Sequence, residues 1–145
     1  MSVVGEHEHA HRPTTPGDPD AHGGGHGLAE QLEARALDRA LGDRRGIARY
    51  GDATVPMDDA LARAAVDLGG RRASVIDLQL DPGLARHMLQ SLADSGRMCI
   101  HVEATGDDPH HVAEAAFKAL ARALRVACEP DPRRTGVAST KGSLG

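Results

Sequence analysis

The stretch DALARAAVDLGGRRASVIDLQL, residues 59–80, decides how the middle of the chain folds. Helix propensity alone would accept its first half, which is rich in Ala. The pair Gly69-Gly70 argues against a continuous helix, because it separates an apolar run ending at Leu68 from an alternating one beginning at Val75. Two short apolar runs around a glycine pair predict a β-hairpin.

Helix and strand patterns alternate on both sides of this stretch. Before it, residues 28–41 carry leucines at helical spacing and Gly42 supplies a stop, while residues 46–57 indicate a loop and a strand closed by Pro56. After it, the turn Asp81-Pro82-Gly83 leads into a helix over residues 84–92, and residues 98–102 indicate a short strand. These segments supply two further helices and strands around the predicted hairpin.

The last long helix is predicted to begin at Pro109, after a pair of acidic capping residues. It continues to residue 127 and is expected to bury Phe117, Leu120 and Leu124. The order helix, strands, helix, strand, helix predicts an α+β fold in which helices are layered on one mixed sheet.

The composition predicts one domain with an aliphatic core. A chain of 145 residues can bury one modest core, and with one Phe, one Tyr and no Trp that core must come from Leu, Val, Ala and Met. Residues 1–26 are rich in His, Gly, Pro and Asp, so we expect a disordered tail there and a domain over residues 27–145.

The same bulk features bear on partners and compartment. The formal charge of −4 gives no basic surface for nucleic acid, and neither a membrane span nor a secretory signal is recognisable. The two cysteines, Cys99 and Cys128, are far apart in the sequence and are expected to be buried free thiols in a reducing cytoplasm.

A His-His-x-x-Glu pattern stands at the start of the last helix. Adjacent residues His110 and His111 point about 100° apart around a helix, so each would face a different metal ion. Glu114 is expected on the face of His111, and Lys118 continues that stripe. His87 in the preceding helix could supply a third imidazole. These ligands would suit zinc, iron, nickel or manganese, and the alternative is that the histidines are solvated capping residues.

Several motifs resemble imidazoleglycerol-phosphate dehydratase, in that family's order. They cover residues 40–144, close to three-quarters of the chain. The resemblance implies one complete αβ half-repeat of the two in that family, plus the last helix of the other half. The motifs are LGDRRGIARYG (41–51), VPMD (55–58), DLGGR (67–71), HHVAEAAFKA (110–119), ARAL (121–124) and DPRRTGVASTKG (131–142).

The resemblance implies a manganese-dependent hydro-lyase of histidine biosynthesis, which converts D-erythro-imidazole glycerol phosphate to imidazole acetol phosphate. That family assembles into a 24-subunit shell with sites at subunit interfaces, so a cytoplasmic homo-oligomer is expected. The substrate's imidazole would bind metal while cations and a hydroxyl hold its phosphate. By position, the metal ligands would be His87, His110, His111 and Glu114, and the phosphate-binding residues Arg49, Arg71, Lys118, Ser139 and Lys141.

The sequence departs from the family in the region of the first half. The glutamate expected to act as base has no counterpart, so the catalytic base is unassigned. Where the first half has its own paired histidines, His22, His26 and Glu30 could form a degenerate ligand set or belong to a flexible glycine-rich tail. The alternative functions are an impaired metal- or phosphate-binding paralogue, an accessory subunit completed by a partner, or a gene product without function.

Overall fold

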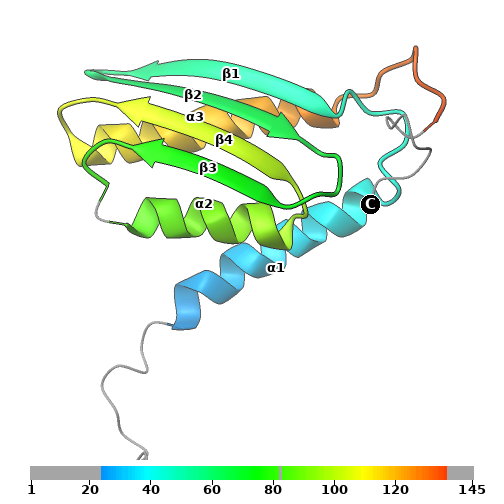
Figure 1. Ribbon diagram of the computed structural model, residues 1–145, viewed down its shortest axis with the longest axis horizontal. Helices are drawn as coiled ribbons and strands as arrows, with labels where there is room; N and C mark the ends of the chain where they lie inside the picture. The colour runs from blue at the N-terminus through cyan, green and yellow to red at the C-terminus, as the bar shows by residue number, and fades with distance from the viewer. Residues whose placement is uncertain (1–23, 82, 137–145) are drawn as a thin grey trace, which may run out of the picture.

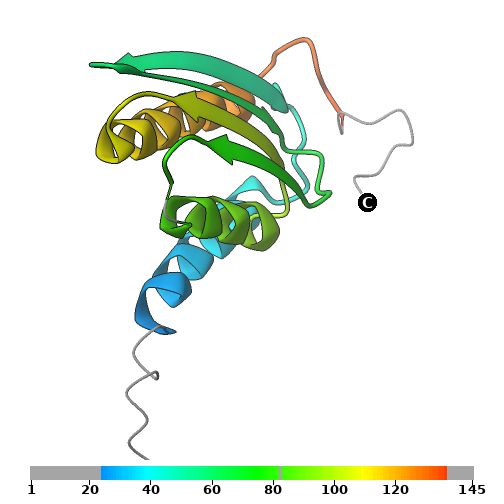
Figure 2. The same cartoon turned by 60° about the vertical axis from the view of Figure 1, so that its left-hand side comes forward.

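A computed structural model describes residues 24–81 and 83–136 of the chain. The strands form one mixed sheet in the order β1-β2-β4-β3, with β3 and β4 parallel and the other pairs antiparallel. The three helices lie on one face of this sheet (Figures 1 and 2), which confirms the predicted α+β fold. The elements are α1 (Gly24–Leu41), β1 (Tyr50–Met57), β2 (Ala60–Asp67), β3 (Ala73–Leu78), α2 (Leu84–Ser95), β4 (Cys99–Thr105) and α3 (Pro109–Cys128).

The predicted hairpin around Gly69-Gly70 is wrong, although both of its strands exist. β2 lies between β1 and β4, so β3 pairs with β4 in parallel and α2 makes the crossover that a parallel pair needs. The link after β2 is held from elsewhere. Leu68 donates its N–H to the carbonyl oxygen of Arg49 at 3.0 Å, and its own carbonyl accepts from Arg44 at 2.8 Å. These bonds hold the link between β2 and β3 in place, where the glycine pair predicted a tight turn.

The hairpin of this fold joins β1 to β2 through Asp58 and Asp59. Met57 pairs with Ala60, so the turn has two residues, and Asp58 adopts a φ of 48°. Aspartate tolerates this left-handed region better than most residues with a Cβ. The sequence does not predict this turn, because Asp-Asp is not one of the dipeptides that mark two-residue hairpins, such as Asn-Gly or Asp-Gly.

Small side chains bring α3 close to β1 and β2. Burial along β2 alternates with a period of two, which places Ala60, Ala62 and Ala64 toward the helix layer. A Cβ added at Gly51 of β1 would lie 2.1 Å from the carbonyl oxygen of Ala123, so the strand and helix backbones approach closely there. The aliphatic core that the composition predicted is confirmed. Its fully buried larger members are Leu68, Leu89, Met98, Ile100, Val102, Val112 and Leu120.

Helix α1 differs from its prediction at its start and in its buried stripe. It begins at Gly24, ahead of the predicted Leu28, and it packs on α2. Ala34 is buried, whereas Leu32 is 56% exposed, because the N-terminal part of α1 extends past α2 (Figure 2). Residues 24–26, the end of the predicted tail, belong to α1; residues 1–23 lie outside the described residues, so for them the tail stays a prediction.

Some predicted burials are only partial. On α3, Leu120 is buried but Phe117 and Leu124 are half-buried, because the face against the sheet is formed mainly by alanines. Cys99 and Cys128 are free thiols as predicted, but they are half-buried and not buried. Among the described residues, no helix has the length and apolar character needed to cross a membrane.

Candidate functional site

The His-His-x-x-Glu residues lie at the N-terminus of α3, which begins at Pro109 as predicted. The Asp108 side chain is the N-cap and accepts the backbone N–H groups of His110 at 2.7 Å and His111 at 3.3 Å. Pro109 occupies the first helical position, where its missing N–H costs nothing. The cap therefore fixes the backbone from which both imidazoles project.

Glu114 lies between His110 and Lys118 on the surface of α3. Its Oε2 is 3.5 Å from Nε2 of His110, and its Oε1 is 2.8 Å from Nζ of Lys118. The hydrogen bond from Lys118 lowers the pKa of Glu114, so this carboxylate is ionised near neutral pH. Glu114 is spaced to share a face with both histidines, and its contact is with His110. The i,i+4 neighbour His110 is the nearer imidazole, because His111 turns away.

His111 faces the turn between β1 and β2. Its Nδ1 is 2.5 Å from Oδ1 of Asp59, and its Nε2 is 3.5 Å from Oδ2 of Asp58. The hydrogen bond between His111 and Asp59 is the largest cause of both shifts, lowering the pKa of Asp59 far below its ordinary value and raising that of His111. The turn between β1 and β2 thus places two carboxylates next to the ring of His111.

The two imidazoles contact different neighbours, as expected for adjacent residues that point about 100° apart around a helix. Their ring centroids are 6.0 Å apart and the rings are tilted by 54°. Imidazole and carboxylate groups can hold a divalent metal ion, and this ligand set does not choose among zinc, iron, nickel and manganese. Within the described residues, however, no three His, Cys, Asp or Glu side chains converge on one point. His87 is exposed in the first turn of α2 and does not complete a set. The donors fit a divalent metal in kind, but further ligands must complete its coordination.

Arg49 already has a carboxylate partner. Its Nε donates to Oδ1 of Asp67 at 2.7 Å and a terminal nitrogen lies 3.1 Å from Oδ2, in the forked geometry typical of arginine and carboxylate. Its guanidinium carbon lies 4.8 Å from the centre of the Tyr50 ring, and its side chain is 11% exposed. The bond to Asp67 raises the pKa of Arg49. A phosphate at Arg49 would share the guanidinium with Asp67.

The residues predicted to hold phosphate lie at two ends of the sheet. Arg49 precedes the first residue of β1, and Arg71 is exposed in the link after β2 at the same end. Lys118 lies at the other end, where its Nζ is 3.5 Å from Sδ of Met57. β1 has eight residues, which at about 3.4 Å each separates the two groups by roughly 25 Å. Ser139 and Lys141 lie outside the described residues.

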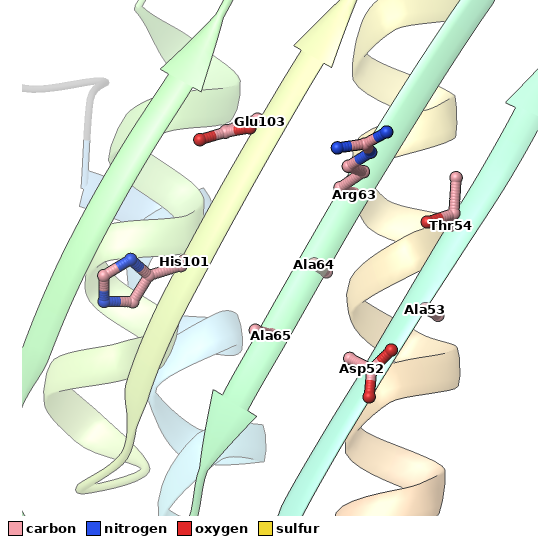
Figure 3. A pocket seen from close by; sticks show the side chains of 8 residues that line it. All are labelled: Asp52, Ala53, Thr54, Arg63, Ala64, Ala65, His101 and Glu103. Atoms are coloured by element: carbon pink, nitrogen blue, oxygen red, sulfur yellow. The ribbon is translucent and has the colours of Figure 1, made fainter.

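A hollow of about 250 Å³ lies on the helix-free face of the sheet (Figure 3). Ala65 on β2 leaves room there between longer side chains of the neighbouring strands. The polar groups around it are all exposed, and none belongs to the residues singled out from the sequence. They are Asp52, Thr54, Arg63, His101 and Glu103.

Comparison with known proteins decides the family. A family model described as imidazoleglycerol-phosphate dehydratase matches residues 31–124. The chain belongs to the imidazoleglycerol-phosphate dehydratase family. The resemblance seen in the sequence motifs is confirmed, and the α3 site lies within the matched residues.

Relatives and solved structures agree with this membership. The imidazoleglycerol-phosphate dehydratase of Bifidobacterium longum is 44% identical over 99% of this chain and 80% of its own length. That of Kineococcus radiotolerans is 50% identical over 76% of this chain, which spans 62% of that relative. The Staphylococcus aureus enzyme structure has a TM-score of 0.68 at 28% identity, over 72% of this chain and 66% of that one. The Pyrococcus furiosus enzyme in complex with (S)-C348 has a TM-score of 0.64 at 33% identity, over 81% and 71%.

The structure adds residues that the sequence motifs did not single out. Asp58 and Asp59 reach the site through the hairpin turn and contact His111. The signal available in the sequence was an acidic pair directly after the strand ending at Met57, of which Asp58 closes the motif VPMD that resembles the family and Asp59 follows it. Recognising the turn as a hairpin would have placed that pair at an edge of the sheet, but not next to α3.

Proposed function

We propose that the chain is a subunit of an imidazoleglycerol-phosphate dehydratase, which eliminates water from D-erythro-imidazole glycerol phosphate to give imidazole acetol phosphate. The observation that carries the proposal is the row His110, Glu114 and Lys118 on α3, in a chain that belongs to this family. The enzyme would be a manganese-dependent carbon–oxygen lyase of histidine biosynthesis in the cytoplasm.

The residues of the α3 end would bind metal and substrate. A divalent metal bound there would polarise the substrate's imidazole ring. His110 and the ionised Glu114 would hold one ion, and His111 would contribute Nε2 to another, with His87 as a further ligand. When Glu114 binds the metal, its ion pair with Lys118 would break. The ammonium of Lys118 would then bind the substrate phosphate.

The division of the site between two ends supports assembly from several copies. Arg49 and Arg71 lie roughly 25 Å from Lys118 in one chain, which is too far for a single phosphate. We propose a homo-oligomer in which the arginine end of one copy meets the histidine end of another, with Ser139 and Lys141 joining the phosphate contacts. A 24-subunit shell, as the resemblance implies, would supply such contacts.

The first test is a dehydratase assay on the manganese-loaded chain, following imidazole acetol phosphate. The wild-type chain is expected to turn over substrate, and Glu114→Gln is expected to lower the rate by at least about 100-fold, because it removes an anionic ligand. Glu129→Gln is the matched control, since Glu129 is an exposed glutamate at the far end of the same helix. Bound manganese without turnover would favour the impaired paralogue or accessory subunit.

The second test is complementation between two damaged chains. Arg71→Ala and Glu114→Gln are each expected to be inactive alone. In co-expressed mixed assemblies, on the order of a quarter of the interfaces would pair an intact arginine end with an intact histidine end, so activity should return to that level. Glu114→Gln mixed with His110→Ala, both damaged at the same end, should recover nothing. Equal recovery in both mixtures, or none in either, would contradict a site shared between copies.

A further inference from the structure

The contact between Asp59 and His111 joins two segments that are 52 residues apart in the sequence. Asp59 lies in the β1–β2 turn, and His111 lies in the first turn of α3. Their approach depends on Gly106 in the loop before α3. A Cβ at that position would lie 2.8 Å from Cβ of Ala60 and 3.1 Å from Oδ2 of Asp59. The missing side chain lets the turn rest against the start of the helix.

The two oxygens of the Asp59 carboxylate have separate partners. Oδ2 accepts the backbone N–H groups of Asp107 at 2.6 Å and Asp108 at 3.0 Å, which fixes the carboxylate relative to α3. Oδ1 faces Nδ1 of His111. An ionised carboxylate can only accept a hydrogen bond, so Nδ1 carries the proton. Nε2 is therefore the nitrogen of the neutral ring that keeps a free electron pair.

We infer that Asp59 is a positioning residue, which orients the ring of His111 and keeps its proton on Nδ1 so that Nε2 can bind a metal ion. The inference rests on the proposed function, in which His111 is a metal ligand. Carboxylates that hold a ligating imidazole in this way fix its tautomer and orientation, and losing one typically lowers metal affinity by about 10- to 100-fold.

The variant Asp59→Asn tests the effect of Asp59 on His111 while leaving the structure of the turn intact. The two side chains have the same size, and the amide oxygen can still accept the N–H groups of Asp107 and Asp108. The amide NH₂ then faces His111 and donates to Nδ1, which moves the proton of the neutral ring to Nε2. We expect this variant to show the inverted tautomer and an affinity for Mn²⁺ lowered on the order of 10- to 100-fold.

Two measurements on the full chain test the inference. Nitrogen NMR of the metal-free protein, at a pH where His111 is neutral, identifies the protonated ring nitrogen, and His111→Gln assigns the signal. A Mn²⁺ titration followed by electron paramagnetic resonance gives the affinity. Asp107→Asn is the matched control, because it removes an equal charge from the adjoining loop while the two carboxylates that contact the ring, Asp58 and Asp59, remain. Both measurements should be unchanged in this control.

An Asp59→Asn protein that keeps the proton on Nδ1 and binds Mn²⁺ as tightly as wild type would overturn the inference. An equal loss of affinity in Asp107→Asn would also overturn it, because charge alone would then explain the effect. A chain that binds Mn²⁺ with these dependences but turns over no substrate would instead overturn the proposed function, and the role of Asp59 would stand.

Discussion

Gly51→Ala is expected to lower the free energy of unfolding by about 3 kcal/mol or more, a large part of the roughly 5–15 kcal/mol of a typical domain. The added Cβ would lie 2.1 Å from the carbonyl oxygen of Ala123 and 2.7 Å from the backbone nitrogen of Ala127. Both are main-chain atoms of α3, so no side-chain rotation relieves the overlap. The helix must move away from β1, which opens the alanine-lined contact between them.

Denaturant unfolding at a fixed protein concentration measures the effect, since assembly would make stability depend on concentration. Gly136→Ala is the matched control, because a Cβ there meets nothing within 4 Å. It is expected to change stability by less than about 0.5 kcal/mol. A Gly51→Ala protein as stable as this control would show that α3 does not pack on β1 at the distance described.

Arg44→Met is expected to cost about 3–5 kcal/mol, the range for breaking a buried ion pair. Arg44 is 3% exposed, and its guanidinium donates to the carbonyl oxygens of Leu68 and Arg97 at 2.8 Å and of Gly96 at 3.0 Å. It also pairs with Asp38 of α1. Methionine fills similar space but donates no hydrogen bond to the three carbonyls and the carboxylate that Arg44 contacts.

The neighbouring arginine provides the control for this prediction. Arg45 is exposed and lies 3.8 Å from Asp43, so Arg45→Met is expected to change stability by less than about 0.5 kcal/mol. Arg44→Lys should remain destabilised, because one ammonium cannot reproduce a planar fork that reaches four acceptors. A stable Arg44→Lys protein would mean that charge, and not the fork geometry, holds these segments together. Equilibrium unfolding of the three variants distinguishes these cases.

Local patterns predicted the parts of the site that depend on neighbours in sequence. The cap at Asp108, the proline at the first position of α3 and the divergence of His110 and His111 all follow from helix geometry over a few residues. The pairing of Glu114 was predicted less well. Residues three and four apart are both neighbours on a helix, and the contact of His111 with Asp59 left His110 as the partner.

Contacts between distant segments could not be predicted in this way. The Gly69-Gly70 pair resembles a hairpin turn, yet both edges of β2 are occupied by β1 and β4. The role of Asp59 depends on a contact across 52 residues, and no local pattern encodes it. Nor could local patterns show that Arg44, in the same motif as Arg49, is a buried structural arginine.

The sequence by itself determined the helices, the strand patterns, the aliphatic core and the family. Propensity, periodicity and motif order are properties of consecutive residues, so no tertiary contact is needed to recognise them. The tertiary structure alone decided that β3 joins β4, that Arg44 is buried, and that the histidine and arginine ends lie apart. These depend on which faces are buried against each other. Burial is a property of the packed chain, and a segment's pattern states only that a face must be buried, not what covers it.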